Sequence, residues 1–329
     1  MMEALRLGTI GSGSIVHTIL NFVGQTEGIR LDAVYSRRED TGLALAQQYG
    51  ASRVYTRLED LLHDPDLDVI YIASPNLLHY EQTRQALLAD KHVICEKPFC
   101  PRAEQVDELT ALAEDRGLLL AEAVPTTFLP NYQVLKHSLS KLGRIRLVLA
   151  NYSQRSYRYD SLLQGEMPNI FNPQLAGGCL MDINYYNLYL TVALFGRPEE
   201  VVYTPNLFRG IDTSGVVQLH YADFTAACAG AKDSWGVNAY QIEGEDGFLY
   251  VKDGSNGLAE IRLVTRDSDE TINLQPFPDR RYYEVQALTE LFRAGSAGEL
   301  TPRLALSRLA VETAQRARAS AGLRFPGDP

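Results

Sequence analysis

The fold is decided by residues 5–20, which read LRLGTIGSGSIVHTIL. The apolar run that opens the chain, Ala4–Ile10, is followed by the turn Gly11-Ser12-Gly13, and apolar residues then recur at helical spacing from Ile15 onward. This order is typical of a strand, a tight turn and a helix. A second apolar run at 31–35 adds another strand, so the segment predicts a β-α-β unit.

The same alternation of strands and helices continues to about residue 122. Strands are expected at 54–55, 69–73, 92–95 and 118–121, and helices at 41–49, 58–62, 80–89 and 102–116. Strands that alternate with helices of this length indicate a parallel sheet with helices on both faces. The first 122 residues therefore predict an α/β Rossmann domain with a doubly wound parallel sheet.

The pattern changes after residue 122, where strands are joined by turns. They are expected at 144–152, 200–203, 215–221, 240–244, 247–251 and 260–265, and helices at 282–293 and 302–321. A chain of 329 residues also favours two domains over one. Residues 123–329 are thus expected to form an α+β domain with a large, mostly antiparallel open sheet.

Composition excludes several classes of protein. The formal net charge of -10 makes broad attraction to nucleic acid or to anionic membranes unfavourable. No run reaches the roughly 18 apolar residues of a membrane helix, and strand-like sequence from Leu5 leaves no room for a signal segment. The four cysteines lack metal-binding spacing. A cytoplasmic protein without a metal site is expected.

The glycine turn is the first candidate binding site. In a β-α-β unit, backbone amides of such a turn approach a pyrophosphate at the positive end of the helix. The residues expected to do so are Gly11, Ser12, Gly13, Ser14 and Ile15. Val16 stands where a third glycine or alanine is usual. The alternative is a tight turn that binds nothing.

The end of the second strand predicts which dinucleotide binds. A fold specific for NAD usually has Asp or Glu there, whereas this chain has Ser36-Arg37-Arg38. A hydroxyl and guanidinium groups suit a 2′-phosphate, because arginine offers a planar fork of charged donors. NADP(H) is therefore the favoured cofactor and NAD(H) the alternative. The other interpretation is that these arginines belong to a solvated loop.

Two further motifs follow the strands at 69–73 and 92–95. Ser74-Pro75-Asn76 comes first with His79 downstream, and Glu96-Lys97-Pro98 follows the later strand. The carboxyl ends of parallel strands form the edge where open α/β sheets bind ligands. His79 either lines the cofactor pocket or packs at its helix start, and Lys97 is either functional or a surface lysine.

In this order and spacing, together with the later segment 177–186, which reads GGCLMDINYY, these motifs resemble the glucose-fructose oxidoreductase, inositol dehydrogenase and rhizopine catabolism (Gfo/Idh/MocA) family over nearly the whole chain. The resemblance implies an NAD(P)-dependent oxidoreductase acting on CH-OH groups of a sugar, polyol or dihydrodiol. It also implies that the strand-end residues contact the cofactor, namely Ser74, Pro75, Asn76, His79, Glu96 and Lys97.

The segment 177–186 departs from the common family pattern. Many members have a histidine as acid/base four residues after Asp182, whereas this chain has Tyr186, which is similar to the tyrosine-bearing dihydrodiol dehydrogenase-like members. The resemblance implies that Tyr186 handles the proton. Asn184 replaces a common glycine and puts the local backbone geometry in question.

The same roles can be argued from chemistry. Hydride transfer to or from a carbon requires a proton to move at the neighbouring oxygen. A free phenol has a pKa of about 10, and a nearby ammonium such as that of Lys97 would favour its ionised form. Asp182 lies one helical turn before Tyr186 and would orient Lys97 or a substrate hydroxyl. Alternatively, Asp182 is a helix cap and Tyr186 a core aromatic residue.

The substrate itself is expected to be a small molecule held by Lys97, Tyr157, Asp182 and Tyr186. Tyr157 belongs to a polar and aromatic stretch at 152–173 that forms either a substrate rim or an interdomain loop. Family members use the open sheet for dimer contacts, which implies a homodimer or homotetramer. The rival hypotheses are a non-catalytic NAD(P)-binding sensor or co-regulator, and an enzyme that retains its cofactor between two substrates.

Overall fold

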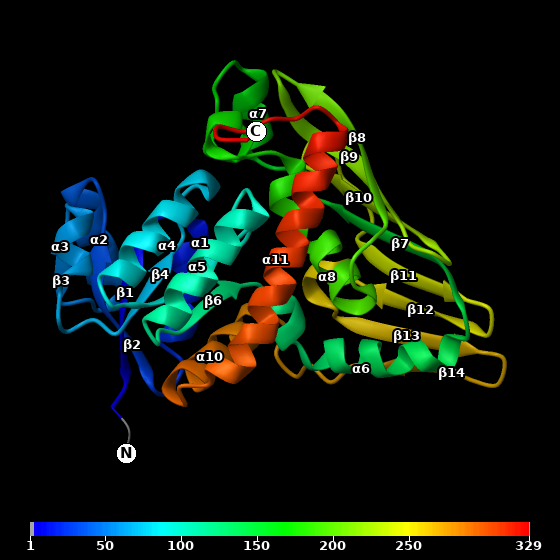
Figure 1. The fold of residues 1–329 in the computed structure, drawn as a ribbon, viewed down its shortest axis with the longest axis horizontal. Helices are drawn as coiled ribbons and strands as arrows, with labels where there is room; N and C mark the ends of the chain where they lie inside the picture. The colour runs from blue at the N-terminus through cyan, green and yellow to red at the C-terminus, as the bar shows by residue number, and fades with distance from the viewer. Residues whose placement is uncertain (1–2, 329) are drawn as a thin grey trace. The chain divides into compact units, whose positions relative to one another are not determined.

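The computed structural model describes residues 3–328, which divide into two compact units (Figure 1). The first unit contains the chain up to Val124 together with Arg281–Arg308, and the second contains Pro125–Arg280 and the chain from Leu309. The segment 281–308 thus belongs with the N-terminal unit although it follows the second sheet in sequence.

The first unit is built on a six-stranded parallel sheet with the order β3-β2-β1-β4-β5-β6. Its strands are β1 (Leu5–Ile10), β2 (Ile29–Tyr35), β3 (Arg53–Tyr55), β4 (Val69–Ile72), β5 (His92–Glu96) and β6 (Leu120–Ala123). Its helices include α1 (Ser14–Val23), α2 (Glu39–Tyr49), α3 (Leu58–Leu62), α4 (His79–Leu88) and α5 (Ala103–Asp115). The predicted Rossmann sheet is confirmed.

The strand order reverses between β1 and β4, which lie side by side. Because parallel crossovers are right-handed, the connections on the two sides of this point lie on opposite faces of the sheet. A crevice opens at the carboxyl ends of the strands where the order reverses, and this is where doubly wound sheets bind dinucleotides. The glycine turn follows β1, and Ser74 lies just beyond β4.

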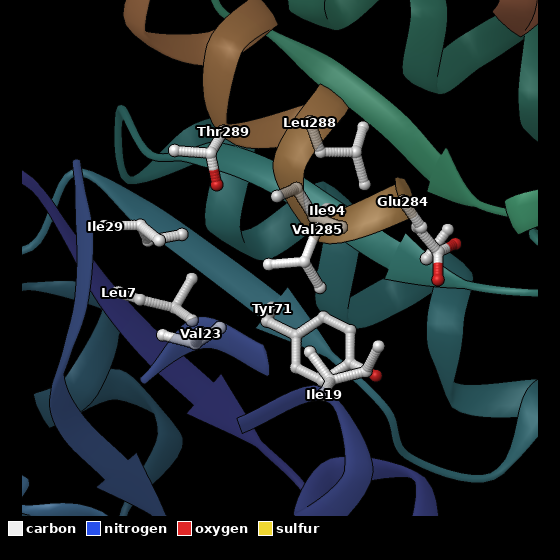
Figure 2. Close-up of a pocket in the computed structure, with 11 residues that line it drawn as sticks. Leu7, Ile19, Val23, Ile29, Tyr71, Ile94, Glu284, Val285, Leu288 and Thr289 are labelled. Carbon is white, nitrogen blue, oxygen red and sulfur yellow. The ribbon is translucent and has the colours of Figure 1, made fainter. Parts of the chain in front are cut away.

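The helix α10 (Arg280–Arg293) closes one face of this sheet. Val285 and Leu288 from α10 face Leu7, Ile19 and Tyr71 in Figure 2. The cavity that remains between them has a volume of about 20 Å³, which is room for about one water molecule. This face is therefore filled core and leaves no room for a ligand larger than a water molecule.

The second unit has an eight-stranded sheet with the order β14-β13-β12-β11-β7-β10-β9-β8. Its strands are β7 (Ile145–Ser153), β8 (Glu200–Phe208), β9 (Ile211–His220), β10 (Thr225–Ala231), β11 (Ala239–Gly244), β12 (Gly247–Lys252), β13 (Glu260–Thr265) and β14 (Asp269–Ile272). All neighbours pair antiparallel except β7 and β10. The predicted large and mostly antiparallel sheet is confirmed.

One face of this second sheet is covered and the other is open (Figure 1). The helices of the unit are α6 (Pro130–Ser138), α7 (Arg158–Leu163), α8 (Tyr185–Phe195) and the short α9 (Gly254–Gly257). Along β7, Val148, Ala150 and Tyr152 are buried, whereas Leu149 points the other way and is 41% exposed. The 24-residue helix α11 (Ala297–Ser320) contributes residues to both units.

Within residues 3–328 no helix has the length and apolarity needed to span a membrane. In the same range, no three His, Cys, Asp or Glu side chains are grouped in a way that could hold a metal ion. All four cysteines are buried and unbridged.

Candidate active site

The glycine turn has the geometry that an anion needs. Gly11 has φ of +118°, and a Cβ atom there would lie 2.5 Å from the carbonyl oxygen of Ala73, so only glycine fits. Gly13 is the N-cap of α1, where no side chain caps the helix and no acidic residue lies in the first turn. A Cβ atom on Gly13 would meet open space. Exposed, uncapped amides at a helix N-terminus fit a pyrophosphate group.

Val16, at the usual position of a third glycine, is fully buried. Its Cγ2 atom would be 3.5 Å from a Cβ atom on Gly11, an ordinary van der Waals distance, and its amide bonds to the carbonyl of Gly13 at 3.0 Å. The side chain therefore packs under the turn without filling it.

The two arginines after β2 differ in their surroundings. Arg38 forms an ion pair with Asp40 at 2.6 Å, and this hydrogen-bonded guanidinium lowers the pKa of the Asp40 carboxyl to about 2. Arg37 is exposed and makes no ion pair within the described part of the chain. Ser36 lies beside them and accepts from the amide of Arg38 at 3.3 Å. Arg37 is thus the better placed of the two arginines to bind a 2′-phosphate.

His79 ties together the loops that follow β4 and β5. The side chain is 1% exposed. Its Nδ1 atom lies 3.0 Å from the carbonyl oxygen of Pro98, and its Nε2 atom lies 2.8 Å from that of Ser74. Burial lowers the pKa of His79. The structure shows the packing role that the sequence left open, and contact of His79 with a cofactor stays a prediction.

Lys97 stands at the end of β5, half-buried, with a cis peptide bond to Pro98. The preceding Glu96 is buried and accepts a hydrogen bond from the phenol of Tyr71 at 2.7 Å. Burial raises the pKa of Glu96, while that phenol and the positive charges of Lys97 and Arg281 act in the opposite direction. Glu96 is therefore part of a buried polar group beneath Lys97. Contact between Glu96 and a cofactor also stays a prediction.

In the second unit, a turn of π-helix (Leu180–Asn184) precedes α8 and carries Asp182. Such π-turns are frequent at functional sites. The start of this turn is held by Asp212 of β9, whose Oδ2 atom accepts from the amide of Leu180 at 2.7 Å and from the phenol of Tyr203 at 2.8 Å. Gly178 has φ of +110°, and a Cβ atom there would collide with the Asp212 carboxylate.

Asp182 is paired with a residue that the sequence did not single out. Its carboxylate forms an ion pair with the ammonium of Lys232, directly after β10. The N-cap of the π-turn is Cys179, so Asp182 does not cap the turn. No motif surrounds Lys232, and 50 residues separate it from Asp182, which is why local pattern gave no signal for it.

Tyr186 lies in the first turn of α8 and is mostly buried. It shares a cluster with Tyr152, Cys179 and Ile183, and its ring lies 5.9 Å from that of Tyr152. The guanidinium of Arg280 lies over its ring at 5.7 Å, a cation–π contact that the sequence did not predict. The phenol therefore stands among aromatic and cationic neighbours.

Two other sequence predictions concern the same unit. Asn184 adopts ordinary right-handed helical angles, and its amide donates to the carbonyl of Cys228 at 2.9 Å, so glycine is not required there. It fits because residue 230 is glycine: a Cβ atom on Gly230 would lie 2.7 Å from that of Asn184. Tyr157 is 74% exposed, and its phenol accepts from Arg158 at 2.9 Å.

The predicted residues thus form two groups. The glycine turn, Arg37, the Ser74-Pro75-Asn76 loop and Lys97 lie at the strand ends of the first unit, and Asp182 and Tyr186 lie on one helical segment of the second. The first group fits a dinucleotide. The second offers a carboxylate and a phenol, which suit recognition of hydroxyl groups and proton transfer.

Comparison with known proteins agrees with this division. Residues 5–124 match the oxidoreductase family with an NAD-binding Rossmann fold, and residues 137–250 match the GFO/IDH/MocA C-terminal domain. The chain is 35% identical to the uncharacterized oxidoreductase YgjR of Escherichia coli, over 98% of both chains. It is 33% identical to scyllo-inositol 2-dehydrogenase (NADP(+)) IolU of Bacillus subtilis, over 98% of this chain and 99% of that protein.

Among solved structures, KijD10, a 3-ketoreductase from Actinomadura kijaniata in complex with NADP and TDP-benzene, has the same fold. The TM-score is 0.84 at 23% identity, over 97% of this chain and 98% of that one. Family matches that cover more than half of the chain, together with relatives of full length, establish the assignment. The chain belongs to the Gfo/Idh/MocA family of oxidoreductases.

Proposed function

We propose that the chain is an NADP(H)-dependent dehydrogenase or reductase that moves a hydride between the nicotinamide and a carbon of a polyol, sugar or dihydrodiol. The observation that carries this proposal is the presence in one chain of two complementary groups. An uncapped glycine turn fits a pyrophosphate, and Asp182 and Tyr186 follow each other on one helical segment. The first binds a dinucleotide, and the second handles a hydroxyl.

The residues that would hold the cofactor follow the strand ends. Gly11, Ser12, Gly13, Ser14 and Ile15 would bind the pyrophosphate through backbone amides. Ser36, Arg37 and Arg38 would take the 2′-phosphate, with Arg37 foremost because Arg38 is already paired with Asp40. The NADP(+) dependence of the relative IolU supports the same cofactor, and NAD(H) is the alternative. Ser74, Pro75, Asn76, His79, Glu96 and Lys97 would complete the site.

The bound cofactor would supply or accept the hydride. The chain's own residues would manage the proton that must move at the substrate oxygen when the hydride leaves or arrives. Tyr186 would exchange that proton through its phenol, and the ammonium of Lys97 would stabilise the phenolate. Asp182 would accept a hydrogen bond from a substrate hydroxyl. This mechanism requires Lys97 and Tyr186 to converge beside the nicotinamide.

The proposed substrate is a small neutral polyol or sugar. IolU acts on scyllo-inositol, a ring on which every carbon bears a hydroxyl, and the carboxylate of Asp182 suits such a ligand. Tyr157, although largely exposed, lies on the segment leading into α7 and would contribute at the rim of the pocket.

The chain is further proposed to form a homodimer or homotetramer through the open face of the second sheet. Leu149 and Val216 are exposed on β7 and β9, and Trp235 is 77% exposed in the loop between β10 and β11. Exposed apolar side chains of this kind favour association. In this proposal residues 1–122 bind the dinucleotide and residues 123–329 bind substrate and mediate oligomerisation, in the cytoplasm, where the four unbridged cysteines would stay reduced.

The experiment combines binding with turnover. NADPH fluorescence titration should show tight binding, and scyllo-inositol, myo-inositol, D-xylose and D-glucose are then each assayed with NADP⁺ at 340 nm. At least one should be oxidised, and Tyr186→Phe should reduce kcat by on the order of 10²- to 10⁴-fold without loss of NADPH binding. Leu43→Gln, on the exposed face of α2, serves as a neutral control.

Two outcomes would contradict the proposal. NADPH binding without turnover of any of these compounds would indicate a sensor or co-regulator. A Tyr186→Phe enzyme with the wild-type rate would return the phenol to a packing role. Cofactor that stays bound through extensive dialysis would instead indicate an enzyme that recycles it between two substrates.

A further inference from the structure

The ion pair between Lys232 and Asp182 is asymmetric in its exposure to solvent. The Lys232 side chain is 4% exposed, whereas the Asp182 side chain is 22% exposed. The ammonium also lies 5.6 Å from the ring centre of Phe171. The pair therefore buries its cation and presents its anion, so a ligand that approaches it would meet the carboxylate first.

The backbone fixes Lys232 in place. Its amide donates to the carbonyl of Thr213 at 2.8 Å, and its carbonyl accepts from the amide of Ser156 at 2.9 Å. The residue thus links the start of β9 to the segment that leads into α7. A buried ammonium held this rigidly is stable only when it is paired with a counter-charge. The ion pair therefore ties the Asp182 carboxylate to a residue whose backbone is fixed.

Tyr186 is four residues beyond Asp182, where the π-turn passes into α8. Side chains four residues apart lie on the same side of a helix. The carboxylate and the phenol therefore occupy one helical face, and a ligand bound at the phenol would place its neighbouring groups near the carboxylate.

We infer that Lys232 is a positioning residue that determines specificity: it holds the Asp182 carboxylate oriented so that it accepts from the hydroxyl adjacent to the reacting one. This inference rests on the proposed function. Because the pair has no net charge, it favours neutral ligands with adjacent hydroxyls. Removal of Lys232 would take away the charge that neutralises the Asp182 carboxylate, and the uncompensated negative charge would repel anions.

A purely structural role predicts a different result. If Lys232 served only to hold β10 against the π-turn, its replacement would lower the melting temperature and leave the kinetics of the folded enzyme unchanged. A positioning role predicts a selective loss in kcat/KM for the polyol, while the affinity for NADPH is retained.

The test uses Lys232→Met, Lys232→Arg, Asp182→Asn and the double variant Asp182→Asn/Lys232→Met, with Lys252→Met as the matched control on an exposed lysine of the same unit. With scyllo-inositol and NADP⁺, Lys232→Met should lower kcat/KM by on the order of 10- to 100-fold, mainly through KM. Lys232→Arg should recover part of this loss. The double variant should lose no more than Asp182→Asn alone, because both changes remove the same interaction.

The outcomes separate the inference from the proposed function. If the wild-type enzyme oxidises the polyol and Lys232→Met matches it within twofold, the inference is wrong and the function stands. Equal kcat/KM values for Asp182→Asn and the double variant support the inference, and this comparison holds even if Lys232→Met fails to fold. A double variant with a clearly lower kcat/KM than Asp182→Asn overturns the inference. A wild-type enzyme that oxidises none of the polyols overturns the proposed function, and the inference with it.

Discussion

Replacement of Asp212 by asparagine should change how the stability of the protein depends on pH. Asp212 is fully buried in β9, where it holds the start of the π-turn that carries Asp182. Burial raises the pKa of its carboxyl from 3.8 to about 6, although hydrogen bonds from Leu180 and Tyr203 oppose this shift. Asparagine keeps the size of the side chain and cannot ionise.

The sign and size of the effect follow from linkage. In the unfolded chain the carboxyl loses its proton near pH 3.8, and in the folded protein it loses it near pH 6. Between these values the folded state binds more protons, so the contribution of Asp212 to stability falls as the pH rises from about 4 to 6. A shift of this size corresponds to about 3 kcal/mol. The Asp212→Asn variant should not show this loss of stability, because its side chain cannot ionise.

Asparagine also removes one acceptor oxygen, which costs about 1 kcal/mol at every pH. The informative quantity is therefore the difference in free energy of unfolding between variant and wild type, compared at pH 4 and pH 7. Because part of the decline has already occurred at pH 4, it should shift by about 2 kcal/mol in favour of the variant at the higher pH.

Urea unfolding followed by circular dichroism at four pH values measures this difference. Asp223→Asn, at an exposed position between β9 and β10, is the matched control and should show no such shift. A difference for Asp212→Asn that stays constant from pH 4 to pH 7 would mean that Asp212 ionises equally in the folded and unfolded states, contrary to this prediction.

Two further predictions concern the cofactor. Gly11→Ala places a methyl group 2.5 Å from the Ala73 carbonyl and should weaken NADPH binding by at least about tenfold. Gly117→Ala, which also has positive φ but meets nothing within 4 Å, should bind normally, and equal dissociation constants for the two variants in fluorescence titrations would count against the pyrophosphate site. Arg37→Ala should weaken NADPH by on the order of 10- to 100-fold and NADH little, because one charge-assisted hydrogen bond to phosphate is lost. Equal weakening of both nucleotides would rule out the 2′-phosphate role.

The first sheet was predictable because its signals are local. Each strand is a short apolar run, and each helix that follows has its own apolar face, as in α1, where Val16, Ile19, Leu20 and Val23 are buried. The strands of the second sheet were predicted less completely. β10 reads TAACAGA, which lacks β-branched residues apart from its first threonine, yet it lies in the centre of the sheet between β7 and β9. Its pairing depends on strands distant in sequence.

The helix α6 and the edge strand β14 were also missed. The strand β14 is short and polar, so it lacks the apolar run that marks the other strands. The return of segment 281–308 to the first unit could not be predicted either. Its apolar residues mark a buried face, but nothing in their pattern says which sheet they cover.

The residues of the candidate site likewise divide into those with a local sequence signal and those without one. Residues in motifs, such as Gly11 and Lys97, stand where a strand ends, and the sequence places them there. Lys232 and Arg280 are single cations without a motif, and their contacts with Asp182 and Tyr186 arise only through folding. Single charged residues that contact a site only after folding are identified from the structure and not from the sequence.

The proposed function depends on Lys97 and Tyr186 acting together beside the nicotinamide. The most direct measurement is the distance between Lys97 Nζ and Tyr186 Oη in a crystal structure of the complex with NADP⁺ and scyllo-inositol. We expect the two atoms to lie within about 6 Å of each other, the range over which an ammonium favours a phenolate, and both to face the same carbon of the ligand. A separation beyond about 10 Å, at which salt would screen their interaction, would contradict it.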